Sequence, residues 1–297
     1  MNSNVGKRKR KFFKRAFLIL LAGLMILSIF CGCASGKYDG YQNLYVDPNF
    51  ARGFKVTYKD HEEGGGNGFA NRGYLTYGDT QDNPWWRICQ WGFDHCLIEE
   101  CVEAGKEVYE DGWYKYHDTS KKVEVNPETG SIYLYVDAGK EYEHPRVYGE
   151  QWPSLLVDQL TGSTRRLTEY EELILDFEFT LTEKQNLMTR QEYNSDLHSL
   201  QLFWYITLQD LTHTAQADYM WFGICPFDDR YEMPPEYASV DVGHVDQTNK
   251  FTFLVDTAKY LSEPVKVGEK VHVKYDILPE LKRAYGIAKE RGFLSAS

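Results

Sequence analysis

The sequence predicts an all-β protein in which two large antiparallel sheets pack face to face, with one short helix near the C-terminus. Aromatic residues make up 15% of the chain, including 22 tyrosines, and this composition favours strands over helices. Many short segments alternate apolar and polar residues, which is typical of strands with one buried face. Single β-domains of roughly 200–250 residues are common, so residues 51–297 are predicted to form one β-sandwich domain.

Two segments alternate most clearly, Leu173–Thr182 and Leu200–Asp210. In each, every second side chain is apolar and is expected to face the core, so the side chains between them face outward. Tyr219–Pro226 is predicted as a third strand, and its core-facing side chains are expected to be Met220, Phe222 and Ile224. The other predicted strands are Gly53–Tyr58, Gly73–Tyr77, Trp85–Trp91, Ser131–Val136, Lys250–Asp256 and Lys270–Ile277, and one that begins after Trp152 and Pro153.

A single helix is predicted from Pro279 to Arg291. Proline is favoured in the first turn of a helix, and Glu280 follows it near the positive end of the helix dipole. Gly292 is the type of residue that ends helices. The chain ends five residues after Gly292, whereas a sandwich of this size usually finishes with another core strand. The position of the helix therefore suggests that a final strand is missing.

The first 33 residues have the features of an export signal. Seven basic residues and no acids come before Ala16, and residues 16–30 contain no charged side chain. This apolar run is shorter than the roughly 20 residues that a membrane-spanning helix needs, but it suits the core of a signal peptide. The run is followed by Cys31, Gly32 and Cys33.

This segment resembles the precursors of bacterial lipoproteins, in which a small residue precedes the cysteine that receives the lipid. Gly32 and Cys33 match that pattern, whereas Phe30 departs from the usual leucine. The resemblance implies that residues 1–32 are a signal peptide and that Cys33 carries the lipid. Residues 33–50 would then tether the domain to the extracytoplasmic face of a membrane. An uncleaved N-terminal anchor is the alternative, and it also places the domain outside the cytoplasm.

The charge of the predicted mature chain excludes nucleic acid as a partner. Cleavage after Gly32 removes seven of the 33 basic residues and none of the 44 acids, which leaves 26 basic residues and a net charge of −18. Nucleic-acid binding needs a basic surface. The same charge disfavours acidic polysaccharides unless a local basic cluster such as Arg165-Arg166 takes part. Solubility is the simplest explanation of the charge.

Four cysteines remain beyond Cys33, namely Cys89, Cys96, Cys101 and Cys225. An even number in an exported protein allows disulfides, but the sequence does not determine the pairing. The spacing C-x6-C-x4-C differs from a zinc-ribbon spacing and no paired histidines follow, so no metal site is predicted here. Cys225 lies between Ile224 and Pro226 and is expected to be a buried small apolar residue.

The outward faces of the long strands carry the side chains that suggest a function. Asp176 and Glu178 alternate with apolar residues on one strand, and Gln201 and Tyr205 do so on the next. Trp221 joins them if its strand pairs alongside. Aromatic rings stack on sugar rings, and amides and carboxylates bond sugar hydroxyls. These five residues are therefore predicted to bind a polysaccharide or oligosaccharide.

The architecture and the chemistry of this face are similar to the concanavalin A-like jelly rolls of lectins and β-glucanases. The resemblance covers about residues 150–290 and rests on no signature motif, so it is a likeness of fold. It implies a jelly-roll sandwich that binds or processes polysaccharide. The alternative is a structural or interaction lipoprotein that docks another envelope protein and has no small-molecule site.

Whether the protein is an enzyme remains open at this point. Glycoside hydrolysis needs two carboxyl groups, about 5 Å apart for retention and 6.5–9.5 Å for inversion. Asp176 and Glu178 are the candidate pair, although the Glu-x-Asp-x-x-Glu arrangement of one glucanase family is absent and a solvated sheet face explains them equally well. A polysaccharide lyase reaction through His198 and Tyr205 would need a nearby cation, for which the candidates are Arg190 and Arg230.

The acidic loop after Pro226 has three interpretations. Asp228 and Asp229 could bind Ca²⁺ if Glu232 and loop carbonyls complete its shell. Arg230 could instead pair with one of the aspartates and rigidify the turn. In the third interpretation, Arg230 and Tyr231 lie at the rim of the sugar groove. No other cofactor is predicted.

Overall fold

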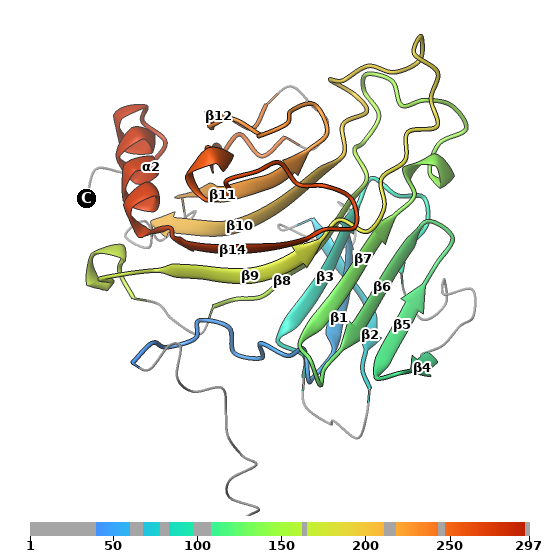
Figure 1. The fold of residues 1–297 in the computed structure, drawn as a ribbon, viewed down its shortest axis with the longest axis horizontal. Helices are drawn as coiled ribbons and strands as arrows, with labels where there is room; N and C mark the ends of the chain where they lie inside the picture. Colours follow the sequence, from blue (N-terminus) through green and yellow to red (C-terminus); the bar gives the residue numbers. More distant parts are fainter. Residues whose placement is uncertain are drawn as a thin grey trace, which may run out of the picture. The chain divides into compact units, whose positions relative to one another are not determined.

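The computed structural model describes residues 40–59, 68–77, 83–97, 108–161, 165–210, 218–242 and 247–294 (Figure 1). Tyr45–Ser297 form one compact unit, and the fold below is the fold of this unit. The predicted signal peptide, the lipidation site Cys33 and Cys101 lie outside the described residues. Among the described residues, no helix is long and apolar enough to cross a membrane.

The first half of the unit contains two four-stranded sheets that share one core. One sheet has the order β2 (Phe69–Leu75), β1 (Phe54–Lys59), β3 (Trp86–Trp91) and β8 (Ser154–Asp158). The other has the order β4 (Val108–Glu110), β5 (Trp113–His117), β6 (Lys121–Asn126) and β7 (Ser131–Val136). Apolar side chains from both sheets meet in a buried cluster that includes Phe54, Val56, Ile88, Val123 and Val125.

The second half contains two further sheets and the α-helix. The larger sheet has the order β10 (Gln201–Asp210), β11 (Asp218–Asp228), β13 (Phe251–Val255) and β12 (Tyr237–Val240). The smaller sheet pairs β14 (Lys270–Asp276) with β9 (Ile174–Thr180), and α2 spans Leu278–Glu290. The short 3-10 helices are η2 (Ala138–Lys140), η3 (Leu167–Glu169) and η4 (Thr257–Lys259).

The alternation of the sequence correctly predicts which side chains enter the second core. Met220, Phe222 and Ile224 of β11 are completely buried, and apolar side chains of β9, β10, β13, β14 and α2 pack around them. Cys225 is buried, as predicted. The helix also agrees with its prediction, because a proline lies in its first turn and Leu281 and Ala288 are buried against the core. The protein is thus predominantly β, and several sheets pack as in an all-β sandwich.

Two features of the sheets differ from the prediction. The sheets are mixed, because β1 pairs with β3 and β11 pairs with β13 in parallel, whereas only antiparallel pairs were expected. Strands β4, β5, β6 and β12 were not predicted. In β6 the reason is that an inward-facing position is taken by Lys121, whose side chain is fully buried against Asp118 with an Nζ to Oδ2 distance of 2.9 Å. A buried ion pair interrupts the apolar alternation from which strands are predicted.

Candidate functional site

Four aromatic rings lie next to one another on the side of β10 and β11 that faces away from the core. We call Phe203, Tyr205, Trp221 and Tyr219 the aromatic row. The ring centroids are 5.2 Å apart between Phe203 and Tyr205, 5.9 Å between Tyr205 and Trp221, and 5.5 Å between Trp221 and Tyr219. The first pair is stacked and the other two meet edge to face, which are the favourable geometries for aromatic pairs. The row therefore forms one connected aromatic surface across two strands.

Gly223 makes room for the centre of this row. It lies directly opposite Tyr205 in the β10–β11 ladder. A Cβ atom at residue 223 would lie 2.7 Å from Cδ1 of Tyr205 and 2.3 Å from the carbonyl oxygen of Trp204, so no larger residue fits without movement. The Tyr205 ring thus lies over the backbone of β11 instead of standing away from the sheet.

The Tyr205 hydroxyl is a permanent hydrogen-bond donor near neutral pH. Burial raises its pKa far above the ordinary value for tyrosine, and negative charge at Cys225 and Asp241 would act in the same direction. The direction of this shift favours the protonated hydroxyl, which can donate a hydrogen bond.

One end of the aromatic row carries a positive charge. The Nζ atom of Lys250 lies 4.6 Å from the centroid of the Tyr219 ring and 3.1 Å from Oδ1 of Asp218. Tyr237 of β12 is 45% exposed and lies opposite Leu254, which is on the strand next to β11. The outward side of this sheet thus combines aromatic rings with a few polar groups, the composition that sugar-binding surfaces need.

At the other end of the strands, Asp228 is the centre of a hydrogen-bonded brace. Arg230 donates from Nε to Oδ1 at 2.9 Å and from Nη2 to Oδ2 at 2.6 Å, and Gln201 donates to Oδ2 at 2.7 Å. Burial alone would raise the pKa of the Asp228 carboxyl, but the hydrogen bonds from Arg230 and Gln201 outweigh it and hold the pKa below its ordinary value. This is the braced turn that was one of the three interpretations of the loop.

The carboxylates considered for Ca²⁺ are engaged in hydrogen bonds in this structure. Both oxygens of Asp228 already accept hydrogen bonds, and Oδ1 of Asp229 accepts one from the backbone N–H of Leu200 at 3.0 Å. Among the described residues there is no group of three or more histidine, cysteine, aspartate or glutamate side chains that could hold a metal ion. Tyr231 next to the brace is 48% exposed, and the Arg230 guanidinium lies 5.4 Å from its ring centroid.

The two candidate catalytic carboxylates lie in a different sheet from the aromatic row. On β9, Asp176 contacts Nε2 of His272 at 2.7 Å and Glu178 contacts Nζ of Lys270 at 2.6 Å, both on the neighbouring strand β14. The β9–β14 sheet and the β10–β11 sheet direct their apolar side chains into the same core. Their other side chains therefore point away from this core on separate surfaces, and the structure does not bring Asp176 and Glu178 together with Tyr205 and Trp221.

His198 is held by the backbone at both ring nitrogens. Its Nδ1 accepts from the N–H of Asn194 at 2.9 Å, and its Nε2 lies 2.9 Å from the carbonyl oxygen of Arg146. Tyr205 lies four residues into β10, roughly 13 Å along the strand from its start. His198 and Tyr205 are therefore not positioned to act as an acid–base pair. Of the two expected cations, Arg230 is paired with Asp228, and the guanidinium that contacts the His198 loop belongs to Arg146.

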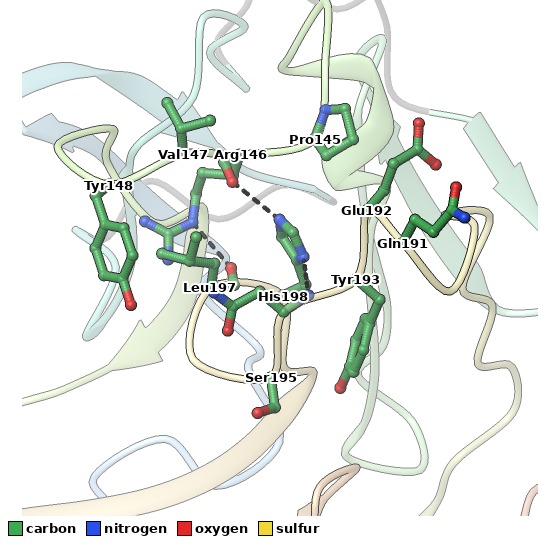
Figure 2. Close-up of a pocket in the computed structure, with 11 residues that line it drawn as sticks. Pro145, Arg146, Val147, Tyr148, Gln191, Glu192, Tyr193, Ser195, Leu197 and His198 are labelled. Atoms are coloured by element: carbon green, nitrogen blue, oxygen red, sulfur yellow. Dashed lines mark hydrogen bonds between the residues drawn. The ribbon is translucent and has the colours of Figure 1, made fainter.

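His198 and Arg146 line an open pocket of about 720 Å³ between two long loops (Figure 2). Residues 141–153 and 181–200 form these loops and contain neither helix nor strand. Nε of Arg146 donates to the carbonyl oxygen of Leu197 at 3.0 Å. Together with the contact between Nε2 of His198 and the carbonyl oxygen of Arg146, this hydrogen bond connects the two loops. Of its lining residues, the sequence analysis singled out His198 alone, because loops have no periodicity and the other residues are far apart in the chain.

Comparison with known proteins adds no assignment to these surfaces. No protein-family model matches the sequence, and neither the curated proteins nor the solved structures gave a match.

Proposed function

We propose that the protein is a lipid-anchored, extracytoplasmic lipoprotein that binds polysaccharide on the aromatic row. The observation that carries the proposal is the run of four adjacent rings, Phe203, Tyr205, Trp221 and Tyr219, on the outward side of β10 and β11. The four rings do not pack into the core around Met220, Phe222 and Ile224, so another reason is needed for their adjacency. Stacking on sugar rings is such a reason.

The proposal includes a jelly-roll topology for the sandwich and binding without catalysis on this surface. The carboxylates Asp176 and Glu178 belong to another sheet. Hydrolysis needs two carboxyl groups on either side of one glycosidic bond, and none of the four residues of the row is acidic. Gln201 and Arg230 serve as a brace that fixes the end of the strands, with Tyr231 at the rim.

A glycan array with the soluble domain, residues 45–297, tests the proposal. Wild-type protein should bind at least one class of polysaccharide, and Trp221→Ala should weaken that binding by about tenfold or more, as truncating an aromatic anchor does in other interfaces. The matched control is Trp85→Ala, because Trp85 is 45% exposed and lies in the first half of the chain.

Two results would contradict the proposal. One is the absence of binding to any glycan, and the other is binding that Trp221→Ala leaves unchanged. Pull-down of a single envelope protein by the wild-type domain, lost in the Trp221→Ala variant, would instead favour the docking role.

The lipid anchor has its own test. Cys33→Ser should abolish metabolic labelling with a fatty acid and leave the precursor uncleaved, because Cys33 is the residue that the resemblance assigns to the lipid. Cys31→Ser is the matched control and should be labelled normally. Equal labelling of the Cys33→Ser variant would refute the anchor without affecting the sugar-binding proposal.

A further inference from the structure

The strongest unassigned feature is the buried guanidinium of Arg146 in the loop pocket. Only 8% of this residue is exposed. Its Nε and Nη1 donate to the carbonyl oxygens of Leu197 and Glu150 at 3.0 and 2.8 Å, and the guanidinium lies 4.2 Å from the centroid of the Trp152 ring. Among the described residues, no carboxylate is paired with it at ion-pair distance, although the charge of Glu150 acts on it.

A buried cation without a carboxylate at ion-pair distance is unusual, because buried charges are normally paired. Lys121 in the first core illustrates the usual arrangement, with carboxylate oxygens of Asp118 and Glu141 at 2.9 and 4.0 Å. Burial lowers the pKa of Arg146, and negative charge at Tyr142, Glu150 and Tyr148 would act in the opposite direction. Carbonyl groups satisfy two of its nitrogens, and Nη2 donates no hydrogen bond to any described residue.

The rest of the pocket has the chemistry of a sugar site. Tyr148 is 74% exposed, and Figure 2 shows it on the opposite side of His198 from Tyr193. Glu192 is the acidic side chain of the lining, and it lies on the side of His198 away from the Arg146 guanidinium. Its Oε2 accepts a hydrogen bond from the N–H of Thr189 at 2.8 Å, which turns it toward its own loop.

The pocket adjoins the end of the proposed sugar-binding sheet. Burial raises the pKa of the Tyr193 hydroxyl, and the charges of Asp229, Arg230 and Asp228 also act on it. Leu200, at the end of the same loop, exchanges hydrogen bonds with Asp229. A glycan that lies along β10 and β11 therefore has the pocket near one end of its path.

We propose that the loop pocket binds the carboxylate of a uronic acid residue, with Arg146 as its cationic partner and Tyr148 and Tyr193 beside the sugar ring. This names the substrate class of the proposed function and rests on it. A guanidinium donates to carboxylate oxygens in a fixed geometry, and a carboxylate would supply the missing negative charge. The high negative charge of the whole protein disfavours acidic polymers, so Arg146 would act as a local exception.

The test compares a uronate trisaccharide, trigalacturonate, with the same trisaccharide after its carboxyl groups are reduced to alcohols. Titration calorimetry with the wild-type domain should give about tenfold tighter binding of the uronate, the effect of one or two hydrogen bonds between charged groups. Arg146→Gln should abolish this preference and leave the affinity for the reduced sugar unchanged. Equal affinities of wild-type protein for the two sugars would overturn the proposal.

Variants separate this proposal from the one on which it rests. Tyr148→Ala should weaken both trisaccharides alike, and Tyr74→Ala, which removes a 50% exposed tyrosine from β2, should weaken neither. Tyr148 is exposed, so its variant remains informative even if Arg146→Gln fails to fold. An unchanged affinity of Tyr148→Ala would contradict the uronate site. If wild-type protein binds neutral glycans through Trp221 but shows no preference for uronate, only the pocket assignment fails; if it binds no glycan at all, the proposed function fails too.

Discussion

The two sheets around the second core have inner faces of the same character and outer faces of opposite character. On the outer face of β9 and β14, oppositely charged side chains pair across the strands, as Glu178 does with Lys270 and Asp176 with His272. On the outer face of β10 and β11, aromatic rings contact one another. Cross-strand charge pairs are a sufficient reason for a solvated sheet face, since they improve solubility and pairing. The rings on the other outer face have no such cross-strand charge pairing, and the proposed function assigns a ligand to them.

The comparison indicates where function should be sought when residue types alone are ambiguous. Asp176 and Tyr205 both occupy outward positions of alternating strands, and both are chemically able to contact a sugar. Their surroundings separate them, because the carboxylate is already engaged by a neighbouring strand and the tyrosine lies in a row of rings over Gly223. Substitutions in the charge pairs of β9 and β14 and in the aromatic row of β10 and β11 should therefore differ in their effects on stability and on binding.

The largest expected effect is that of Gly223→Ala. The new Cβ would lie 2.3 Å from the backbone oxygen of Trp204, which cannot move without disturbing the β10–β11 ladder. Overpacking of this kind should lower the free energy of unfolding by about 3 kcal/mol. Urea denaturation of wild-type and variant protein measures the loss. Displacement of Tyr205 should also weaken glycan binding in the protein that remains folded.

The matched control is Gly286→Ala in α2. A Cβ at Gly286 meets no atom within 4 Å, and alanine is favoured over glycine in a helix. This substitution should stabilise the protein by about 1 kcal/mol or less. A Gly223→Ala variant as stable as wild-type protein would show that the aromatic row does not depend on the close approach of Tyr205 to β11.

An intermediate effect is expected from Asp228→Asn in the brace at the end of the same strands. Removing the charge weakens two hydrogen bonds from Arg230, which should cost about 2 kcal/mol at pH 7. Because the folded-state pKa of Asp228 lies below its unfolded value, the carboxylate contributes stability above about pH 4 and loses it as the pH falls through the folded pKa. Denaturation curves at pH 7 and pH 3 should show the difference between wild-type and variant protein shrinking at the lower pH.

Asp196→Asn is the control for this experiment. Asp196 is exposed in the loop before β10, and such surface substitutions change stability by at most about 0.5 kcal/mol. A stability difference for Asp228→Asn that is the same at both pH values would mean that the charge of Asp228 is not what holds Arg230 and Gln201.

Alternation in the sequence was enough to predict the orientation of side chains in the second half of the chain. For Met220, Phe222 and Ile224 the prediction needs only the two-residue period of a strand, and all three are completely buried. The aromatic row follows from the same period once β10 and β11 are assumed to pair. Alternation does not predict which strands pair with each other, because pairing depends on backbone hydrogen bonds between distant segments. Hence β9, assumed to share a face with β10, pairs with β14 instead.

The loop pocket lay beyond sequence reasoning for a different reason. Arg146 and His198 are 52 residues apart, and each belongs to a loop whose conformation follows no regular period. Loops longer than roughly 12 residues are uncommon in compact domains and often functional, which was the one available signal. The burial of Lys121, and with it strand β6, was missed for a similar reason. A lysine in a short alternating segment is taken to be solvent-exposed until its partners Asp118 and Glu141 are known.

The smallest effect is expected on the other face, from Glu178→Gln. Glu178 and Lys270 are 52% and 68% exposed at their side chains, and an ion pair so exposed contributes about 1 kcal/mol or less to stability. The variant should bind glycans as wild-type protein does, because its side chain lies in a sheet separate from the aromatic row. Parallel titrations of Glu178→Gln and Trp221→Ala with the same polysaccharide measure this contrast. If the Glu178→Gln variant lost glycan binding or a hydrolytic activity, the two outer faces would have to contribute to one site. That result would contradict their separation.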